Sequence, residues 1–135
     1  MRKGFIVDIS DCRIGNEITK VVLKKSYEVA NQLPDPNKAK GDRTYKVSIT
    51  FYQSKDRWRP YDKTIPREDR GDLDNLTKMI FDGLGPIIGF RKQWDTGEPV
   101  NSERRMDSRI LELTAKKVNS GSDKEMVSVE IETLA

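Results

Sequence analysis

Histidine is missing from this chain of 135 residues. Imidazole is the side chain that most often titrates near neutral pH and ligates metals, so any catalysis here has to use carboxylates, lysine, hydroxyl groups or metal-bound water. A single cysteine, Cys12, excludes an intramolecular disulfide framework, and without histidine it also excludes a cysteine–histidine zinc site. So little cysteine is typical of a reducing compartment, and we expect a cytoplasmic protein.

Long apolar runs are absent as well. No stretch approaches the roughly 20 apolar residues of a membrane-spanning helix, and the two basic residues after Met1 are not followed by the apolar region of a signal peptide. Hydrophobic and charged residues each make up 35% of the chain, but the apolar ones fall into periodic runs. We therefore predict one folded domain over residues 1–135, without a membrane partner.

The formal net charge is only +3, which by itself says little about partners. The positions of the basic residues say more, because they lie on both sides of an acidic segment. These residues are Arg57, Arg59, Arg67, Arg70, Arg91, Lys92, Arg104, Arg105, Arg109, Lys116 and Lys117. A catalytic site that accepts a polyanion while it holds a metal ion needs such positive flanks, so nucleic acid is the expected partner.

Apolar periodicity predicts six secondary-structure elements. Alternation with a period of two marks strands, spacings of three and four mark helices, and Gly, Pro and Asn clusters mark their ends. In chain order we expect a strand at 4–9, a helix, a strand at 45–51, a second helix at 73–84, and two strands at 110–118 and 126–131 that form a terminal hairpin. The first helix is predicted to begin after an N-cap at Asn16 and to end at Pro34. The second is predicted to have Asp72 as its N-cap and to end at Gly85-Pro86. Residues 53–70 and 87–106 are predicted to be irregular. This β-α-β-α-β-β order indicates an α+β fold, with helices packed on a largely antiparallel sheet.

The start of the second predicted helix concentrates polar groups in the segment Arg70-Gly71-Asp72-Leu73-Asp74-Asn75-Leu76-Thr77-Lys78. Asp72 and Asp74, two residues apart, are hard oxygen ligands suited to Mg²⁺ or Mn²⁺. Lys78 lies four residues after Asp74 and shares its face of the helix. The same residues also suit a structural role, in which Asp72 caps the helix and an Asp74–Lys78 pair contributes about 0.2–0.5 kcal/mol.

A helical wheel divides this helix into two faces. The apolar face carries Leu73, Leu76, Met79, Ile80 and Leu84. The opposite face carries Asp74, Asn75, Lys78 and Asp82. The charged groups of the segment are therefore predicted to gather on the exposed side of the helix.

This pattern resembles the signature of RusA-type Holliday junction resolvases, a family of crossover junction endodeoxyribonucleases. In that family a basic loop leads into an Asp-x-Asp-Asn-Leu helix with a following lysine, which is similar to residues 70–84 here. A second family element, an aspartate before a strand, is similar to Met106–Leu113, with Asp107 as the matching acid. The family usually has paired aspartates there, and Met106 stands in place of the first.

The resemblance implies a RusA-like α+β fold and a homodimeric endonuclease that resolves four-way DNA junctions by paired symmetric nicks. It implies Mg²⁺ as cofactor, with Mn²⁺ as a possible substitute. The implied catalytic acids and metal ligands are Asp72, Asp74 and Asp107, and the implied catalytic lysine is Lys78.

Other carboxylates and amides are placed around these residues. Asp95 is the rival of Asp107 for the third acid, and we prefer Asp107 because it directly precedes a predicted strand. Asn75 and Asp82 are predicted to support the metal ligands or Lys78 from the same helix face.

The basic flanks are predicted to bind DNA. Arg67 and Arg70 precede the acidic helix and are candidates for phosphate contacts, as are Arg57 and Arg59. Trp58, between the latter two, suits either stacking on an unpaired base or packing back over the core. Two rival functions stay open: a nuclease for other branched DNA, and a non-catalytic DNA-binding module. A junction-cutting protein is expected at the nucleoid, or in the host cytoplasm if a phage encodes it.

Overall fold

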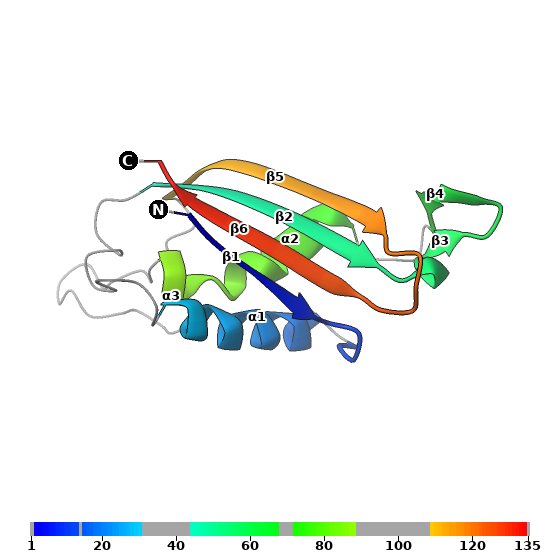
Figure 1. Cartoon of the computed structure of the whole chain (residues 1–135), viewed down its shortest axis with the longest axis horizontal. Coiled ribbons are helices and arrows are strands. Elements are labelled where there is room, and N and C mark those ends of the chain that lie inside the picture. The colour runs from blue at the N-terminus through cyan, green and yellow to red at the C-terminus, as the bar shows by residue number, and fades with distance from the viewer. Residues whose placement is uncertain (1, 14, 31–43, 68–71, 89–108, 135) are drawn as a thin grey trace.

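A computed structural model describes residues 2–13, 15–30, 44–67, 72–88 and 109–134 (Figure 1). The helices and strands follow each other in an order that extends the predicted one. They are β1 (Arg2–Asp8), α1 (Gly15–Ala30), β2 (Tyr45–Gln53), the 3-10 turn η2 (Lys55–Arg57), β3 (Trp58–Arg59), β4 (Asp62–Pro66), α2 (Leu73–Asp82), α3 (Gly85–Ile88), β5 (Ile110–Asn119) and β6 (Met126–Thr133).

The main sheet has the strand order β1-β6-β2-β5. The β1–β6 and β2–β6 pairs are antiparallel and the β2–β5 pair is parallel, so the sheet is mixed and mostly antiparallel. This confirms the α+β class. The predicted hairpin of the last two strands is wrong, because β2 lies between β5 and β6. The connection between them crosses the end of β2, where the Ser120 N–H donates to the Gln53 carbonyl at 2.8 Å.

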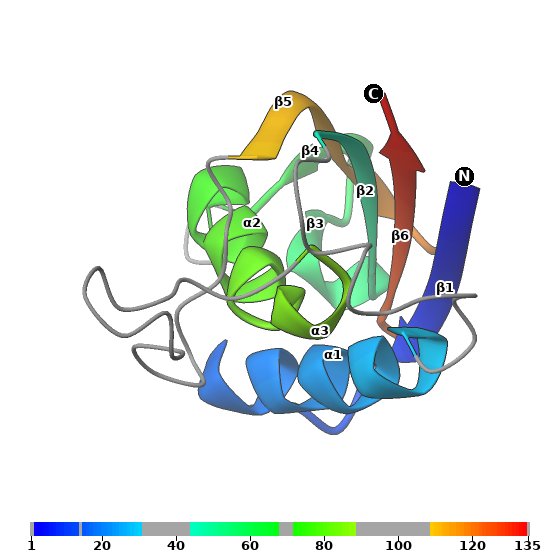
Figure 2. The ribbon, with the colours of Figure 1, turned by 90° about the vertical axis from the view of Figure 1, so that its left-hand side faces the viewer.

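The helices cover one face of the sheet and leave the other open, as Figure 2 shows. Alternate residues of β2 point into the layer between sheet and helices. Tyr45, Val47, Ile49 and Phe51 are each at most 1% exposed. Burial of each such side chain stabilises the fold by roughly 1.5–3 kcal/mol. The predicted alternation of this strand is therefore confirmed.

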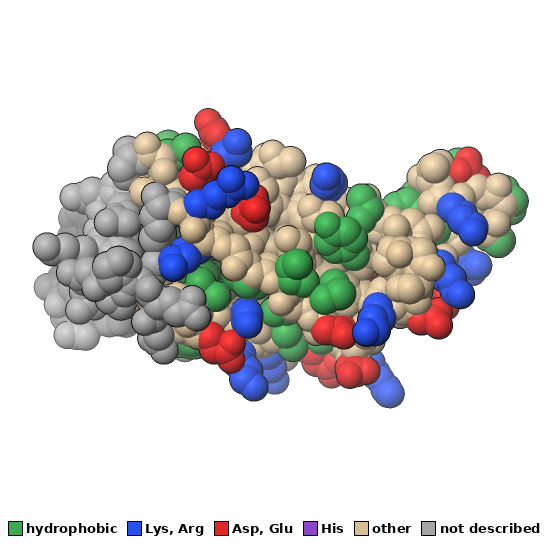
Figure 3. Space-filling model, viewed as in Figure 1, with side chains coloured by type: hydrophobic (Ala, Val, Ile, Leu, Met, Phe, Trp, Pro, Cys, Tyr) green, Lys and Arg blue, Asp and Glu red, His purple; other side chains and the backbone are tan. Residues whose placement is uncertain are grey.

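The open face carries the residues between the buried ones. Ile6 of β1 is 57% exposed and Tyr52 of β2 is 38% exposed. Figure 3 shows small apolar groups near the middle of this face, with charged side chains around them.

The first helix begins at Gly15, so Asn16 lies inside it and is not the predicted N-cap. The carboxylate of Glu17 accepts a hydrogen bond of 2.7 Å from the Arg13 backbone N–H. An acidic side chain in the first turn thereby satisfies a donor just before the helix and favours its positive end. The predicted end of this helix at Pro34 lies outside the described residues.

Part of the stretch predicted to be irregular, residues 53–70, is ordered. Here β3 and β4 form a separate two-stranded antiparallel sheet beyond the end of β2. The Asp62 carboxylate accepts hydrogen bonds from the Thr64 N–H at 3.0 Å and hydroxyl at 2.6 Å, and these bonds lower the pKa of Asp62. Trp58 is 6% exposed, so it packs into the protein and presents no ring for stacking on a base.

Within the described ranges, no helix is both long and apolar enough to cross a membrane.

Candidate active site

The helix that carries the predicted site is held on its apolar side. In α2, Leu76 is 9% exposed and Ile80 is fully buried, as the helical wheel predicts. The Thr19 hydroxyl of α1 donates to the Met79 carbonyl at 3.0 Å. After α2, Gly83 approaches α1 so closely that an added Cβ would lie 2.7 Å from a methyl carbon of Val22. The buried side of α2 is therefore held in place, and its opposite side is exposed.

Asp72 occupies the predicted N-cap position of α2. Its backbone is extended, with φ −66° and ψ 148°, and its carbonyl accepts a 3.0 Å hydrogen bond from the Leu76 N–H. Its carboxylate makes no capping hydrogen bond. The backbone of Asp72 thus starts the helix while its exposed side chain stays available, although an aspartate at this position ordinarily binds the helix N–H groups.

Asp74, Asn75 and Lys78 are exposed on the opposite side of α2 from its buried residues. A purely structural role of these residues would include an ion pair between Asp74 and Lys78. Within the described part of the chain, no ion pair of 4.0 Å or less joins the two side chains. Asp82, one turn further on, is half-buried. The predicted exposed face is confirmed for Asp74, Asn75 and Lys78, whereas Asp82 is partly covered.

Two exposed carboxylates two residues apart, neither of them paired within the described residues, suit a divalent metal that prefers oxygen ligands. Over the residues that the structure describes, no three acidic, cysteine or histidine side chains are grouped to hold a metal ion. Asp107 and Asp95, the two candidates for the third acid, lie outside those residues. Asp72 and Asp74 therefore fit part of a Mg²⁺ site, and the origin of a third ligand stays a prediction.

The helix α2 and the strand β5 begin at different ends of the sheet. Leu76 of α2 lies beside Phe51 and Gln53, near the end of β2. The start of β5, at Ile110, pairs with Tyr45 at the beginning of β2. The first turn of α2 and the first residue of β5 therefore lie at opposite ends of the sheet.

The predicted DNA-binding arginines have different surroundings. Arg67 is exposed, and its Nε donates to the Trp58 carbonyl at 3.3 Å. Arg57 forms an ion pair with Glu125, in which its Nη2 donates to Oε1 at 2.9 Å. Arg59 is half-buried, and Arg70 lies outside the described residues. Arg67 is therefore the described arginine of this set that is both exposed and close in sequence to α2.

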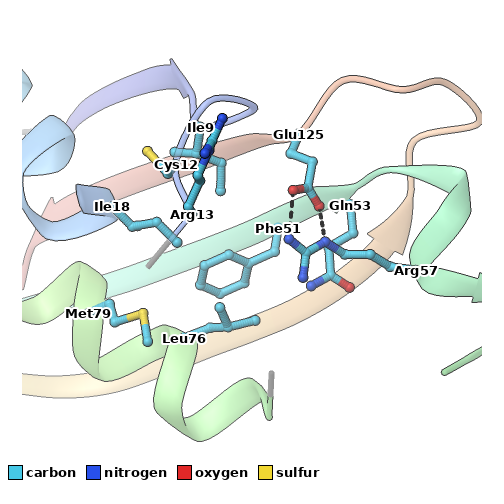
Figure 4. A pocket seen from close by; sticks show the side chains of 10 residues that line it. All are labelled: Ile9, Cys12, Arg13, Ile18, Phe51, Gln53, Arg57, Leu76, Met79 and Glu125. Atoms are coloured by element: carbon cyan, nitrogen blue, oxygen red, sulfur yellow. Dashed lines mark hydrogen bonds and ion pairs between the residues drawn. The ribbon is translucent and has the colours of Figure 1, made fainter. Parts of the chain in front are cut away.

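A pocket lies on the core side of α2, between its first turns and the ends of β1 and β2 (Figure 4). Gln53, Arg57 and Glu125 form its polar wall, and Cys12 lies at the side of β1. Burial is the main cause that raises the pKa of the Cys12 thiol, followed by the nearby charge of Glu17. Sequence reasoning missed Gln53 and Glu125, because nothing in their local sequence marks them.

The chain matches no protein-family model and no curated protein sequence.

Proposed function

We propose that this protein is a divalent-metal-dependent endodeoxyribonuclease that acts as a homodimer on four-way DNA junctions. It hydrolyses phosphodiester bonds by paired symmetric nicks. The observation that carries the proposal is the start of α2, where Asp72, Asp74 and Lys78 are exposed and have no partner among the described residues. Charged side chains on a fixed helix that neither cap it nor pair with each other are available to a substrate.

The residue types fit the chemistry of phosphodiester hydrolysis. A Mg²⁺ ion held by Asp72 and Asp74 would supply an activated water molecule and neutralise phosphate charge. Lys78 presents an ammonium group on the same exposed face of α2 as Asp74, where it stabilises negative charge on the phosphate that is attacked. Neither role requires the histidine that the chain lacks. The third acid of this proposal is Asp107, with Asp95 as its rival.

The substrate side of the proposal rests on the basic residues near α2 and on the resemblance to RusA-type resolvases. Arg67 is exposed five residues before Asp72 and is the residue that we propose to contact a phosphate. A two-fold dimer suits a four-way junction, because two symmetric cuts are needed to resolve it.

The proposal is tested with purified protein, a synthetic four-way junction and a linear duplex of the same arm sequence. With Mg²⁺ we expect paired nicks in opposite strands of the junction, little cutting of the duplex, and no cutting in EDTA. Three-way and forked substrates are measured beside them. Faster cutting of those substrates would favour the branched-DNA nuclease, and tight junction binding without any cutting in Mg²⁺ or Mn²⁺ would favour the non-catalytic module.

A further inference from the structure

The pocket beside α2 has no role in the hydrolytic chemistry proposed above. Its volume is about 190 Å³, and its inner surface is mainly apolar. Phe51, Leu76 and Met79 contribute the apolar part, and Figure 4 shows the Phe51 ring between the two α2 side chains and the polar wall. An aromatic and aliphatic surface with a few polar groups at one end is the usual lining of a small-ligand site.

Gln53 contributes to the polar wall a carboxamide group whose hydrogen-bonding capacity is not fully used. The residue is 5% exposed, and its carboxamide oxygen, itself buried, has no hydrogen-bond partner among the described residues. A buried polar atom without a partner costs about 1–3 kcal/mol. A carboxamide offers an acceptor and two donors, and rotation of the group exchanges their positions. The wall therefore suits a ligand whose edge both donates and accepts hydrogen bonds.

The charge of the wall argues against an anion. Arg57 is neutralised by the two oxygens of Glu125, which is 8% exposed. A phosphate in the pocket would lie near this buried carboxylate and would be repelled by it. A neutral planar heterocycle avoids that repulsion and still packs against the apolar surface.

The pocket lies close to the carboxylates that are proposed to act on the DNA. Leu76, in its wall, donates its N–H to the carbonyl of Asp72, so the pocket lies one helical turn from the first candidate carboxylate. One turn of an α-helix rises about 5.4 Å. Arg13, exposed at the edge of the pocket, adds a positive charge where a DNA strand would enter.

We propose that this pocket receives one unpaired nucleobase of the bound DNA, with Gln53 hydrogen-bonded to the edge of the base. The inference rests on the proposed function, because it requires a bound DNA strand beside α2. Bases at a branch point are already less well stacked, which lowers the free energy of extrusion into a protein pocket. The pocket thereby makes the cleavage rate depend on which base lies next to the cut.

The test uses four-way junctions that carry 2-aminopurine in turn at each position near the branch point. The fluorescence of 2-aminopurine rises when the base leaves the stack. We expect wild-type protein in EDTA to raise it severalfold at one position in each symmetric half. Cleavage of the same junction without the label, in Mg²⁺, is measured in parallel. Cleavage without any fluorescence rise overturns the pocket assignment alone, whereas absence of both binding and cleavage overturns the proposed function together with it.

Two modifications test the pocket: one blocks it, and the other removes its hydrogen-bonding group. N-ethylmaleimide on Cys12, the single cysteine, adds bulk at its wall and should abolish the rise, while Cys12→Ser treated in the same way should keep it. Gln53→Met keeps the size of the side chain and removes the amide, and it should reduce the base preference of cleavage about tenfold. Tyr52→Phe, on the open face of the sheet, is the matched control. A fluorescence rise that survives N-ethylmaleimide on Cys12 means that the base leaves the stack elsewhere, and this would overturn the inference, as would an unchanged base preference in Gln53→Met.

Discussion

At the scale of single residues, Glu125 holds three segments together just before β6. Its carboxylate binds Arg57 of η2 and accepts a 3.3 Å hydrogen bond from the Ser54 N–H after β2. Its backbone carbonyl accepts a 2.9 Å hydrogen bond from the Ile9 N–H, at the end of β1. The wall of the pocket and the start of the β3–β4 sheet thus depend on one side chain.

Glu125→Gln should lower the free energy of unfolding by about 2 kcal/mol, because it leaves the Arg57 guanidinium half-buried without its counter-charge. The matched control is Glu130→Gln in β6, the strand that follows Glu125. Glu130 pairs with Arg2, but those side chains are 50% and 68% exposed, against 11% and 28% for Glu125 and Arg57. We expect the control to cost less than about 1 kcal/mol in urea unfolding. Equal losses for the two variants would contradict this role of Glu125.

At the scale of elements, α2 is fixed by its close approach to α1. Gly83→Ala should destabilise the protein by about 1–3 kcal/mol, because the new Cβ meets Val22 at a distance below van der Waals contact. Val22→Ala removes the clashing methyl groups and leaves a cavity of its own. In a double-mutant cycle followed by thermal unfolding, the two losses should therefore be less than additive. Strict additivity would mean that Gly83 is not in contact with Val22.

Two arginines flank the β3–β4 sheet, Arg57 in η2 before it and Arg67 after it, and a salt titration distinguishes their roles. Arg67→Gln should weaken junction binding and reduce the slope of log Kd against log salt by about one unit, as for one lost phosphate contact. Arg57→Gln should leave the slope unchanged and lower stability instead, because the charge of Arg57 is already neutralised by Glu125. An unchanged slope for Arg67→Gln would exclude a phosphate contact.

The sequence predicted the elements that have a strong local period. β2 alternates over its full length, and α2 has a clear apolar face, so both were placed to within a few residues. β3 has two residues, too few to show any period. The partner of β5 could not be predicted either, since a short turn between two strands favours a hairpin. The insertion of β2 between them depends on contacts between residues far apart in the sequence.

The candidate site could also be predicted only in part. Asp72, Asp74 and Lys78 belong to one helix, so their common exposure follows from helical geometry. That the Asp72 carboxylate does not cap the helix could not be predicted, because the favoured use of an N-cap aspartate is the opposite. The pocket joins residues of the segment after β1, of α1, β2, η2 and α2, and Glu125 just before β6, and only the folded chain brings them together.

At the scale of the whole molecule, β2, α2 and β5 form a crossover unit in which the helix runs back along the sheet (Figure 1). The start of α2 lies at the Gln53 end of β2 and the start of β5 at the Tyr45 end. The nine residues of β2 separate these ends by eight steps, or about 26 Å. Ile110, the first residue of β5 after Asp107 in the sequence, thus lies at the far end of the sheet from Asp72. We therefore expect that Asp72 and Asp74 work with Asp107 of the partner subunit.

Mixing two inactive variants tests this arrangement. Asp72→Asn and Asp107→Asn homodimers should each fail to cut the junction. After unfolding and refolding together, heterodimers should regain one complete site and nick one strand. A site built within each chain would leave every heterodimer inactive, so absence of any nicking in verified heterodimers would contradict the expectation. If Asp107→Asn alone cuts like wild type while Asp95→Asn does not, Asp95 is the third acid.

The central claim is that the carboxylates at the start of α2 perform catalysis. The most direct measurement compares Asp72→Asn with wild type for binding and Mg²⁺-dependent cleavage of the same four-way junction, with Asp123→Asn, an exposed aspartate far from α2 in the sequence, as control. We predict that Asp72→Asn binds the junction about as tightly as wild type but cuts it at least about a hundredfold more slowly, while the control cuts normally. Cleavage by Asp72→Asn at the wild-type rate would contradict the claim.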